Sequence, residues 1–390
     1  PLSSLTFRVS YSLTGTPPDA SYCSALTKLS MNTLYRPTTS DKELGFVVAA
    51  LGNDELTYEK KHEFNFGVDA GFFNNRLNVT FDVYQRRNFD EIAPAVHQLY
   101  GKAYANVGSM KSWGEELSIS STNVKTNDFS WQTSLIYSHN RTEITDLYNQ
   151  GRVIDLVQGT GFAKQGYPAR ALFSIPFVGI NEKGYPVCIN EKGQTTVGDL
   201  DFQERDNTDY LIYEGSTDPI YNGSLGNTFN YKGFHLNLFL TYAFGNVVRL
   251  DPVFKVKYND LTSMTHDFKN RWMQPGDENA TNVPGVVSRY EYELNRTLLN
   301  TAYNAYNYTS VRTAKGDFIR LKEISLAYDF PHRWLENSPV NNISLKLQAT
   351  NLMLLYADKK LNGQDPEFMN AGGVASPMPK QFTLTLKLGL

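Results

Sequence analysis

The sequence predicts an all-β fold in which antiparallel strands form part of a transmembrane β-barrel. The clearest observation is a pair of candidate strands, Tyr221–Tyr231 and Phe234–Phe244, joined at Lys232-Gly233. Apolar and polar side chains alternate along the second strand, as they do when successive residues point to opposite faces of a sheet. Its apolar face carries one aromatic residue, three leucines and two more aromatic residues, in the order Phe234, Leu236, Leu238, Leu240, Tyr242 and Phe244.

The order of residues along this face is the second observation. Aromatic rings favour the two interfaces of a membrane, and aliphatic side chains favour the hydrocarbon between them. A strand from Phe234 to Phe244 rises roughly 33 Å at ~3.3 Å per residue. Tilted by about 40°, it covers roughly 25 Å, which is the height of the apolar band of an outer-membrane barrel. We therefore expect these six residues to face lipid, although a half-buried strand of a soluble protein also alternates.

Composition is the third observation. The 390 residues suffice for a large core or a large barrel, and a hydrophobic content of 41% argues against disorder. Aromatic residues make up 13%, with 24 Tyr and 23 Phe, which is typical of strands and interfaces. The net charge of −3 gives no indication of a nucleic-acid partner. The longest apolar run, Phe46–Leu51, is far shorter than the ~18 residues of a membrane helix.

Alternation predicts five strands before the hairpin. They cover residues 5–13, 64–72, 77–84, 104–121 and 129–138. Asn74-Asn75 is a turn between the second and the third of these strands. We expect residues 15–57 to form a long loop, residues 88–103 to be irregular, and residues 122–128 to form a short link.

Six strands follow the first five, including the hairpin, and longer connections separate most of them. Residues 142–218 are expected to be mostly loop with a strand near Leu172–Ile180, and residues 248–307 form a second excursion with a helical turn at Asp267–Trp272. Further strands are predicted near Phe318–Phe330 and Ile343–Leu355. In the last strand the residues expected to face lipid are Phe382, Leu384, Leu386 and Leu388. The total is about eleven strands.

The lengths of the connections support a barrel. Short links and long loops alternate, as they do where short turns lie on one side of an outer membrane and long loops on the other. No repeat with a period of 20–50 residues is present, which argues against a propeller or a solenoid. The chain opens at Pro1-Leu2 almost directly into a strand and without a signal peptide, so we expect a fragment or one piece of a split molecule.

Four ordered motifs resemble one family. Residues 316–331 read GDFIRLKEISLAYDFP and resemble the late-barrel signature of the SusC/RagA family, the TonB-dependent outer-membrane transporters of Bacteroidetes. Three further stretches are similar to motifs of the same family in the same order: 104–108 with 114–117, 231–234, and 349–352 with 365–367. One departure is the final residue, Leu390, where the family usually has an aromatic residue.

The resemblance implies an architecture and a function. Residues 1–390 would be the C-terminal portion of a barrel of about 22 strands. The plug domain, the segment that contacts TonB and the N-terminal strands are not found, and open strand edges in lipid cost several kcal/mol per unpaired group. The remaining half of the barrel must then come from another segment or chain. The implied function is TonB-dependent import of a glycan or peptide nutrient across the outer membrane of a Gram-negative bacterium, together with a SusD-like surface lipoprotein.

A cluster of aromatic residues is the candidate substrate-binding site. Six rings lie among Asn and Arg residues between positions 272 and 308: Trp272, Tyr290, Tyr292, Tyr303, Tyr306 and Tyr308. Rings with hydrogen-bonding neighbours suit stacking on sugars or holding peptides. The alternative is that these rings pack the loop itself or cover another subunit.

No catalytic constellation is recognisable, so we do not expect an enzyme. His62-Glu63 lacks the second histidine of a zincin site because Phe66 occupies that position. Ser224 lies in a sequence that has Asn222 in place of the first glycine of a nucleophile elbow. No cofactor is implied, and no nucleic acid.

A calcium site is one hypothesis for four acidic residues in one loop, although their spacing does not fit an EF-hand: Asp199, Asp201, Asp206 and Asp209. A solvated acidic loop is the alternative. Cys23 and Cys188 allow one disulfide but do not require it. The competing functional class is a secreted soluble β-sandwich or carbohydrate-binding module, in which apolar faces would pack against each other in a core.

Overall fold

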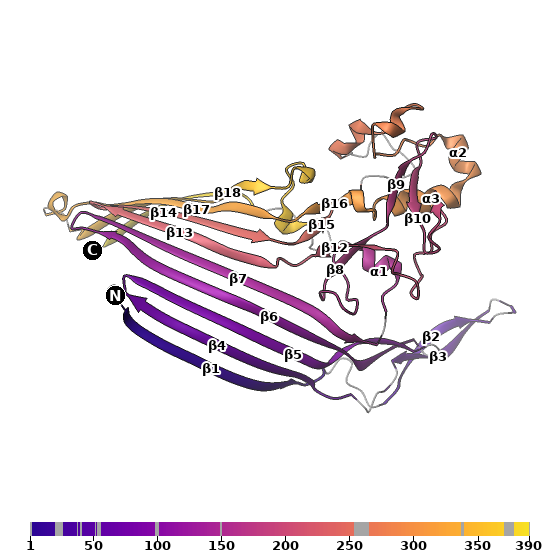
Figure 1. Ribbon diagram of the computed structural model, residues 1–390, viewed down its shortest axis with the longest axis horizontal. Helices are drawn as coiled ribbons and strands as arrows, with labels where there is room; N and C mark the ends of the chain where they lie inside the picture. The colour runs from indigo at the N-terminus through magenta and orange to yellow at the C-terminus, as the bar shows by residue number, and fades with distance from the viewer. Residues whose placement is uncertain are drawn as a thin grey trace.

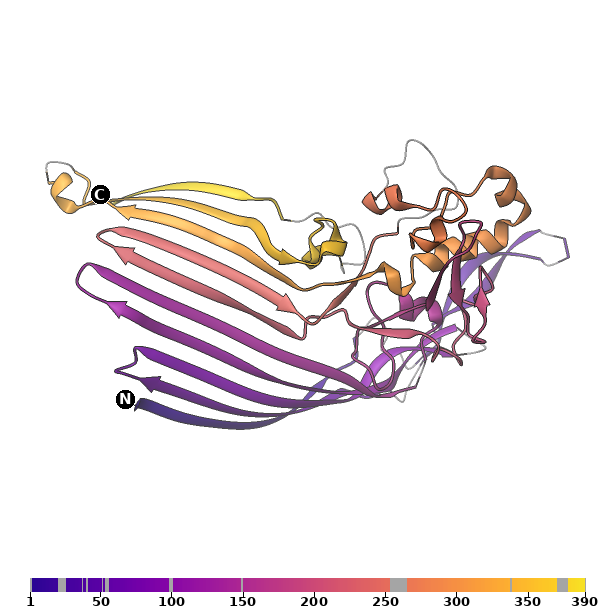
Figure 2. The same cartoon turned by 45° about the horizontal axis from the view of Figure 1, so that its top comes forward.

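The structure is a computed structural model that describes residues 2–389 except 20–25, 37, 40, 51, 53–55, 98–100, 149, 253–264, 337–338 and 370–377. One antiparallel sheet of ten strands makes up most of the described chain, in the order β1-β4-β5-β6-β7-β13-β14-β17-β18-β19. The strands lie side by side in one curved layer, and the remaining elements gather at one end of it (Figures 1 and 2). The short turns lie at the other end.

Five strands of the sheet come from residues 2–147 and five from residues 221–389. The first five are β1 (Leu2–Thr16), β4 (Glu59–Phe72), β5 (Leu77–His97), β6 (Gly101–Lys125) and β7 (Phe129–Leu147). The later five are β13 (Tyr221–Tyr231), β14 (Phe234–Phe244), β17 (Phe318–Asp329), β18 (Asn342–Ala357) and β19 (Gln381–Gly389). Each strand that alternation predicted in these regions is present.

The hairpin of β13 and β14 has the predicted bounds. Its register runs without interruption from Tyr221 opposite Phe244 to Tyr231 opposite Phe234. Lys232 and Gly233 both have positive φ, 45° and 89°, as a two-residue turn that matches the twist of the strands requires. A Cβ at Gly233 would lie 2.8 Å from the carbonyl oxygen of Asp329, so glycine is needed there for space as well.

Two stretches expected to be irregular are strands. Residues 88–103 largely continue β5 and β6, which pair as far as His97 opposite Gly101. The expected loop 15–57 contains a hairpin of β2 (Lys28–Tyr35) and β3 (Lys42–Ala50). Both predictions were wrong because they relied on alternation of apolar and polar residues. Alternation appears only where the two faces of a strand meet different surroundings, whereas backbone hydrogen bonds can continue a strand where both faces meet the same surroundings.

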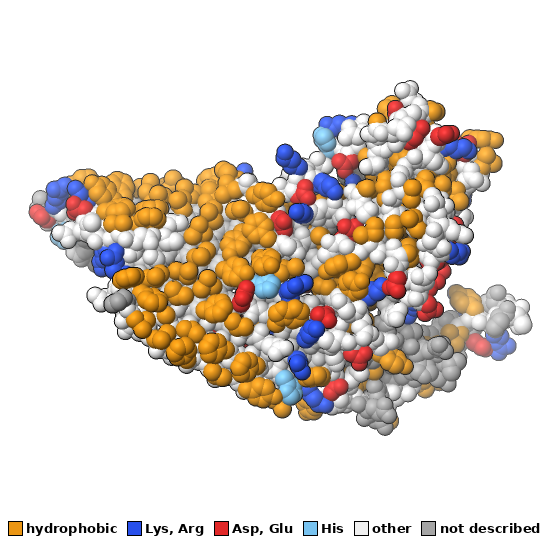
Figure 3. Space-filling model, viewed as in Figure 1, with side chains coloured by type: hydrophobic (Ala, Val, Ile, Leu, Met, Phe, Trp, Pro, Cys, Tyr) orange, Lys and Arg blue, Asp and Glu red, His pale blue; other side chains and the backbone are white. Residues whose placement is uncertain are grey.

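The two faces of the sheet differ in chemistry across its paired strands. One row of directly paired residues from β7 to β19 is entirely apolar: Trp131, Phe229, Leu236, Leu326, Leu347 and Leu384. The adjacent row, one residue along, points to the opposite face and is entirely polar: Gln132, Thr228, Asn237, Ser325, Gln348 and Thr383. We call these surfaces the apolar face and the polar face. Hydrophobic side chains cover the side of the sheet turned toward the viewer in Figure 3.

Side chains of the apolar face are solvent-exposed in this chain. Phe7 is 63% exposed, Leu347 54% and Leu384 69%. A soluble sandwich would bury such residues against a second sheet, and among the described residues no second layer covers them. The β-sandwich alternative is therefore contradicted.

The elements beyond the long-loop end of the sheet form a loop domain, defined here as the described residues of 148–218 and 247–315. Its strands are β8 (Ala171–Ser174), β9 (Phe177–Ile180), β10 (Pro186–Ile189), β11 (Thr195–Thr196), β12 (Ile212–Ser216), β15 (Val247–Arg249) and β16 (Thr313–Lys315). Its α-helices are α1 (Val153–Val157), α2 (Arg289–Leu294) and α3 (Arg296–Tyr306). The predicted helical turn at Asp267–Trp272 is a 3₁₀ turn at His266–Asn270. In the described ranges, no helix is both long enough and apolar enough to span a membrane.

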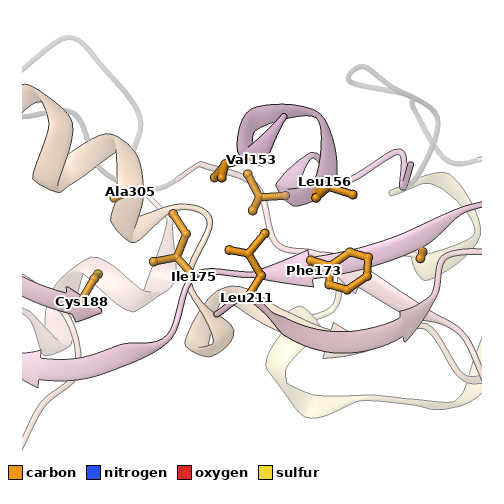
Figure 4. Packing of buried hydrophobic residues seen from close by; sticks show 9 residues of the cluster. Val153, Leu156, Phe173, Ile175, Cys188, Leu211 and Ala305 are labelled. Atoms are coloured by element: carbon orange, nitrogen blue, oxygen red, sulfur yellow. The ribbon is translucent and has the colours of Figure 1, made fainter. Parts of the chain in front are cut away.

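The strand expected at Leu172–Ile180 belongs to the loop domain, so the main sheet has ten strands. It is divided at Ile175-Pro176 into β8 and β9, which pair with β12 and β10 instead of with the main sheet. The core around it brings together α1, β8, β10 and α3 through Val153, Leu156, Val157, Ala171, Phe173, Ile175, Cys188, Leu211 and Ala305 (Figure 4).

Candidate functional site

The polar face carries charged groups of both signs on β1, β4 and β5. Arg8 Nε lies 2.7 Å from a carboxylate oxygen of Asp69, and Arg8 Nη2 lies 2.9 Å from one of Asp82. The Thr80 hydroxyl donates to Asp69 at 2.9 Å. Gly67 lies under this group, where a Cβ would collide with Asp82 and Arg8. Glycine therefore leaves the space in which one arginine can bridge two carboxylates.

A second charged group lies farther along the same face. Glu63 accepts from Lys61 at 2.6 Å and from Arg86 at 3.1 Å, and the Arg86 guanidinium lies 4.2 Å from the centre of the Tyr84 ring. The side chains of Lys61 and Arg86 are 41% and 36% exposed. These groups are open to a polar ligand that passes along this face.

Two buried arginines tie the segments of the loop domain together. Arg249 donates through Nη1 to the Thr309 carbonyl at 2.9 Å and through Nη2 to the Phe173 carbonyl at 2.6 Å. Because its charge is buried, the pKa of Arg249 is lowered to about 10. Arg312 donates to the Asp267 carboxylate and to the Asp251 carbonyl, each at 2.8 Å.

Two of the motifs that resemble the SusC/RagA family meet in space. Arg320 of the 316–331 motif contacts Asp365 of the 365–367 motif at 2.5 Å, and it also lies 3.2 Å from Glu367. The side chains of Arg320 and Asp365 are 6% and 8% exposed. The contact holds the loop after β18 against the polar face.

The structure separates the six predicted aromatic residues into two groups. Tyr303 and Tyr306, each 2% exposed, and Tyr292, 8% exposed, pack inside the loop domain. The Tyr303 hydroxyl donates to the Gly285 carbonyl at 2.6 Å, and burial raises the pKa of Tyr306 to about 12. In this conformation the rings of Tyr292, Tyr303 and Tyr306 form part of a core, and substrate contact by these three residues stays a prediction that their burial does not favour.

The other three rings are more accessible. Tyr290 is 72% exposed. Trp272 is half-buried and donates from Nε1 to Glu278 at 3.0 Å, and Tyr308 is half-buried against Phe202. Trp272, Tyr290 and Tyr308 thus remain predictions for cargo contact.

The four acidic residues suggested for calcium do not converge. Asp199 lies 3.7 Å from Lys192, and Asp209 lies 3.0 Å from Lys164. Asp201 accepts from the backbone of Gln203, and the backbone of Asp206 donates to Glu204. In the part of the chain that the structure describes, no three His, Cys, Asp or Glu residues are placed to hold a metal ion.

Of the two cysteines, Cys188 is buried with a free thiol, and Cys23 lies outside the described residues.

The sequence reasoning missed a cluster on the apolar face near the loop domain. Lys111 and Trp113 lie on the same face of β6 as Leu117 and Ile119. The even spacing of these residues in the sequence could therefore have placed Lys111 and Trp113 on the apolar face. Arg141 was missed because the strand was expected to end near residue 138, whereas β7 continues to Leu147. A cleft of about 260 Å³, which we call the rim cleft, opens beside Trp113 and Arg141.

Comparisons with known proteins find TonB-dependent receptors and a solved transporter structure that resemble this chain. No family model matches the chain. It is 26% identical over 385 residues to TonB-dependent receptor P3 of Formosa agariphila, covering 93% of this chain and 35% of that protein. It is 26% identical over 356 residues to TonB-dependent receptor SusC of Bacteroides thetaiotaomicron, covering 87% and 32%. The RagAB peptide transporter structure matches with a TM-score of 0.76 and 25% identity over 99% of this chain and 40% of that one.

This chain is similar to the SusC/RagA-type TonB-dependent receptors over most of its length. The resemblance that the sequence motifs indicated is thereby confirmed, as is the fold of an outer-membrane barrel wall. The chain is accordingly an outer-membrane protein of a Gram-negative bacterium. It spans about a third of the length of the curated relatives that it matches, such as 35% of P3 and 32% of SusC.

Proposed function

We propose that residues 1–390 form the C-terminal portion of the barrel of a TonB-dependent importer. Among the described strands, β1 pairs only with β4 and β19 pairs only with β18, so the sheet has two open edges. Backbone groups at an open edge have no partners in lipid, and closure removes this penalty. The remaining strands and the plug therefore come from another segment or chain. This agrees with the finding that the chain covers only about a third of the length of its relatives.

The apolar face meets membrane lipid, and the polar face lines the interior of the barrel. The lipid-facing residues include the two sets predicted from the sequence: Phe234, Leu236, Leu238, Leu240, Tyr242 and Phe244, and Phe382, Leu384, Leu386 and Leu388. The observation that carries the proposal is the register, because paired residues keep apolar and polar side chains on separate faces from strand to strand. A barrel wall needs this separation, whereas a buried sheet does not.

The imported nutrient is a glycan or a peptide, and TonB supplies the energy. The relative named RagAB is a peptide transporter, and a surface lipoprotein of the SusD type is the expected partner at the loop domain. The ion-paired groups around Arg8 and Glu63 suit polar cargo because they present both donors and acceptors to the interior. Transport of this kind requires no catalytic residue in this chain.

Uptake by the full-length protein tests the proposal. The complete protein is produced in a Gram-negative host, its outer membrane is isolated, and entry of labelled oligopeptides and oligosaccharides is measured with and without TonB. The expected result is a heat-modifiable outer-membrane barrel and uptake that disappears without TonB. A protein that fractionates without membrane, or uptake that is independent of TonB, would overturn the proposal. Comparison of the two labelled classes identifies the cargo.

A further inference from the structure

Three basic side chains gather on the apolar face where it meets the loop domain. Arg87 of β5 is directly opposite Lys111 of β6, and Arg141 of β7 is directly opposite Trp113 of β6. Paired residues share a face. Leu117 lies on the same face of β6, four residues beyond Trp113 in the direction away from the loop domain. Basic side chains lie along this border in Figure 3, between the hydrophobic surface and the loop domain.

The charges in this cluster are not balanced. Lys111 pairs with Glu143 at 3.0 Å, and Glu115 on the same face of β6 lies 3.7 Å from His139, whereas Arg87 and Arg141 have no ion-pair partner among the described residues. Both arginines are exposed. The cluster therefore offers two uncompensated guanidinium groups, which are the side chains best suited to bind phosphate through two parallel hydrogen bonds.

Trp113 lies in the middle of the cluster. The Lys111 ammonium is 5.6 Å and the Arg141 guanidinium 5.9 Å from the centre of a Trp113 ring. The residues that line the rim cleft beside it, of about 260 Å³, include Trp113, Asn140, Arg141, Glu143, Tyr167 and Asp218. An aromatic ring and hydrogen-bonding groups around a cleft of this size suit one sugar ring.

We propose that this cluster binds the phosphorylated sugar headgroup of an outer-leaflet glycolipid. Arg87, Lys111 and Arg141 contact the phosphate, and Trp113 stacks on the sugar in the rim cleft. The inference rests on the proposed function, which places the apolar face in the membrane with the loop domain outside. Short turns lie on the periplasmic side of such barrels, so this border lies at the level of the outer-leaflet headgroups.

A soluble phosphate could satisfy the same three cations, but the position favours the lipid. One row of paired residues, Val83, Glu115 and His139, separates the cluster from the apolar rows, which begin with Leu117 directly opposite Phe81 of β5 and Tyr137 of β7. A glycolipid whose headgroup sits on the cluster can therefore lay its acyl chains along apolar side chains. A soluble phosphate gains nothing from this surface.

Retention of lipopolysaccharide by the purified full-length protein tests the site. The Arg87→Gln/Arg141→Gln variant is compared with wild type after extensive detergent washing, and bound lipopolysaccharide is measured by mass spectrometry. Loss of two interfacial cations should weaken binding roughly 30-fold. The control is Arg333→Gln, which removes an exposed cation at the short-turn end and should leave retention unchanged. The Arg87→Lys/Arg141→Lys variant should keep most of the binding.

Competition experiments identify the ligand. Lipid A with its phosphates should compete for the site, and dephosphorylated lipid A and inorganic phosphate should not. Equal retention by the double variant and wild type overturns the proposal, and so does displacement by inorganic phosphate alone. Membrane insertion and TonB-dependent uptake are measured on the same preparations. If the double variant inserts into the membrane, imports cargo and still retains lipopolysaccharide like wild type, only the glycolipid site is refuted. If the wild-type protein does not insert, the proposed function is refuted.

Discussion

Arg320 and Asp365 form a nearly buried ion pair that connects the main sheet with the loop after β18. Their charged atoms are 2.5 Å apart, and Asp365 also accepts from the backbone of Glu367 at 3.1 Å. Arg320 lies on the polar face, directly opposite Thr241 of β14. The pair therefore fixes a long connection against the inside of the proposed barrel, close to the loop domain.

Asp365→Asn should destabilise this loop strongly. The substitution leaves only the Glu367 carboxylate, 3.2 Å away and 42% exposed, to compensate the buried Arg320 charge. Breaking a buried pair typically costs up to about 3–5 kcal/mol. The measurement is the urea dependence of protease cleavage within residues 358–369 of the full-length protein. Asp209→Asn is the matched control, because Asp209 is 94% exposed in its pair with Lys164 and such pairs contribute about 0–1 kcal/mol. Equal cleavage in the two variants would show that the buried pair does not hold the loop.

The sequence was sufficient to predict the membrane-crossing strands, and the reason is physical. Where one face meets lipid and the other a polar interior, every second residue is constrained, and the bounds of β13 and β14 follow directly. In the loop domain no such constraint acts, because its core joins Phe173 to Leu211 and Ala305 across long separations. The candidate site was predictable only in part for the same reason.

The aromatic residues show what was missed. Leu299, Ala302, Tyr303 and Tyr306 are spaced as one buried face of a helix, and α3 buries all four. The abundance of rings in this segment suggested a binding loop, whereas their spacing indicates the buried face of a helix. The basic cluster was not predicted because its members are far apart in the sequence. Only the register of the strands brings together Arg87, Lys111 and Arg141.

Leu238→Arg should impair barrel assembly, and Asn237→Arg should not. Leu238 lies on the apolar face in the middle of β14, where an arginine in lipid costs about 2–4 kcal/mol near the bilayer midplane. Asn237 is its neighbour on the polar face, within 3.5 Å of Glu323, which can accept from a new cation. The measurement is the yield of heat-modifiable protein in the outer membrane. Similar losses for both variants would contradict the assignment of the two faces.

Cys188 should be unreactive toward thiol reagents until the loop domain unfolds. Burial raises the pKa of its thiol from 9.0 to about 12, so the reactive thiolate is scarce at neutral pH as well as inaccessible. Because the folded pKa is the higher one, this residue leaves stability unchanged below pH 9 and lowers it as the pH rises from 9 toward 12. Maleimide labelling in a Cys23→Ser background over a urea series measures both effects. Rapid labelling of the folded protein at pH 7 would disprove the burial.

Tyr306→Ala and Tyr290→Ala should separate a structural ring from a ring available to cargo. Tyr306 is 2% exposed in the core of α3, and truncation of a large buried aromatic side chain typically costs about 3–5 kcal/mol. Tyr290 is 72% exposed, so its truncation should change stability by no more than about 0.5 kcal/mol. Unfolding of the loop domain is followed by Cys188 labelling, and cargo affinity is measured on the folded full-length protein. If Tyr290 contacts the cargo, its loss weakens affinity while labelling is unchanged. Unchanged affinity would remove Tyr290 from the site and leave Trp272 as the accessible ring to test next.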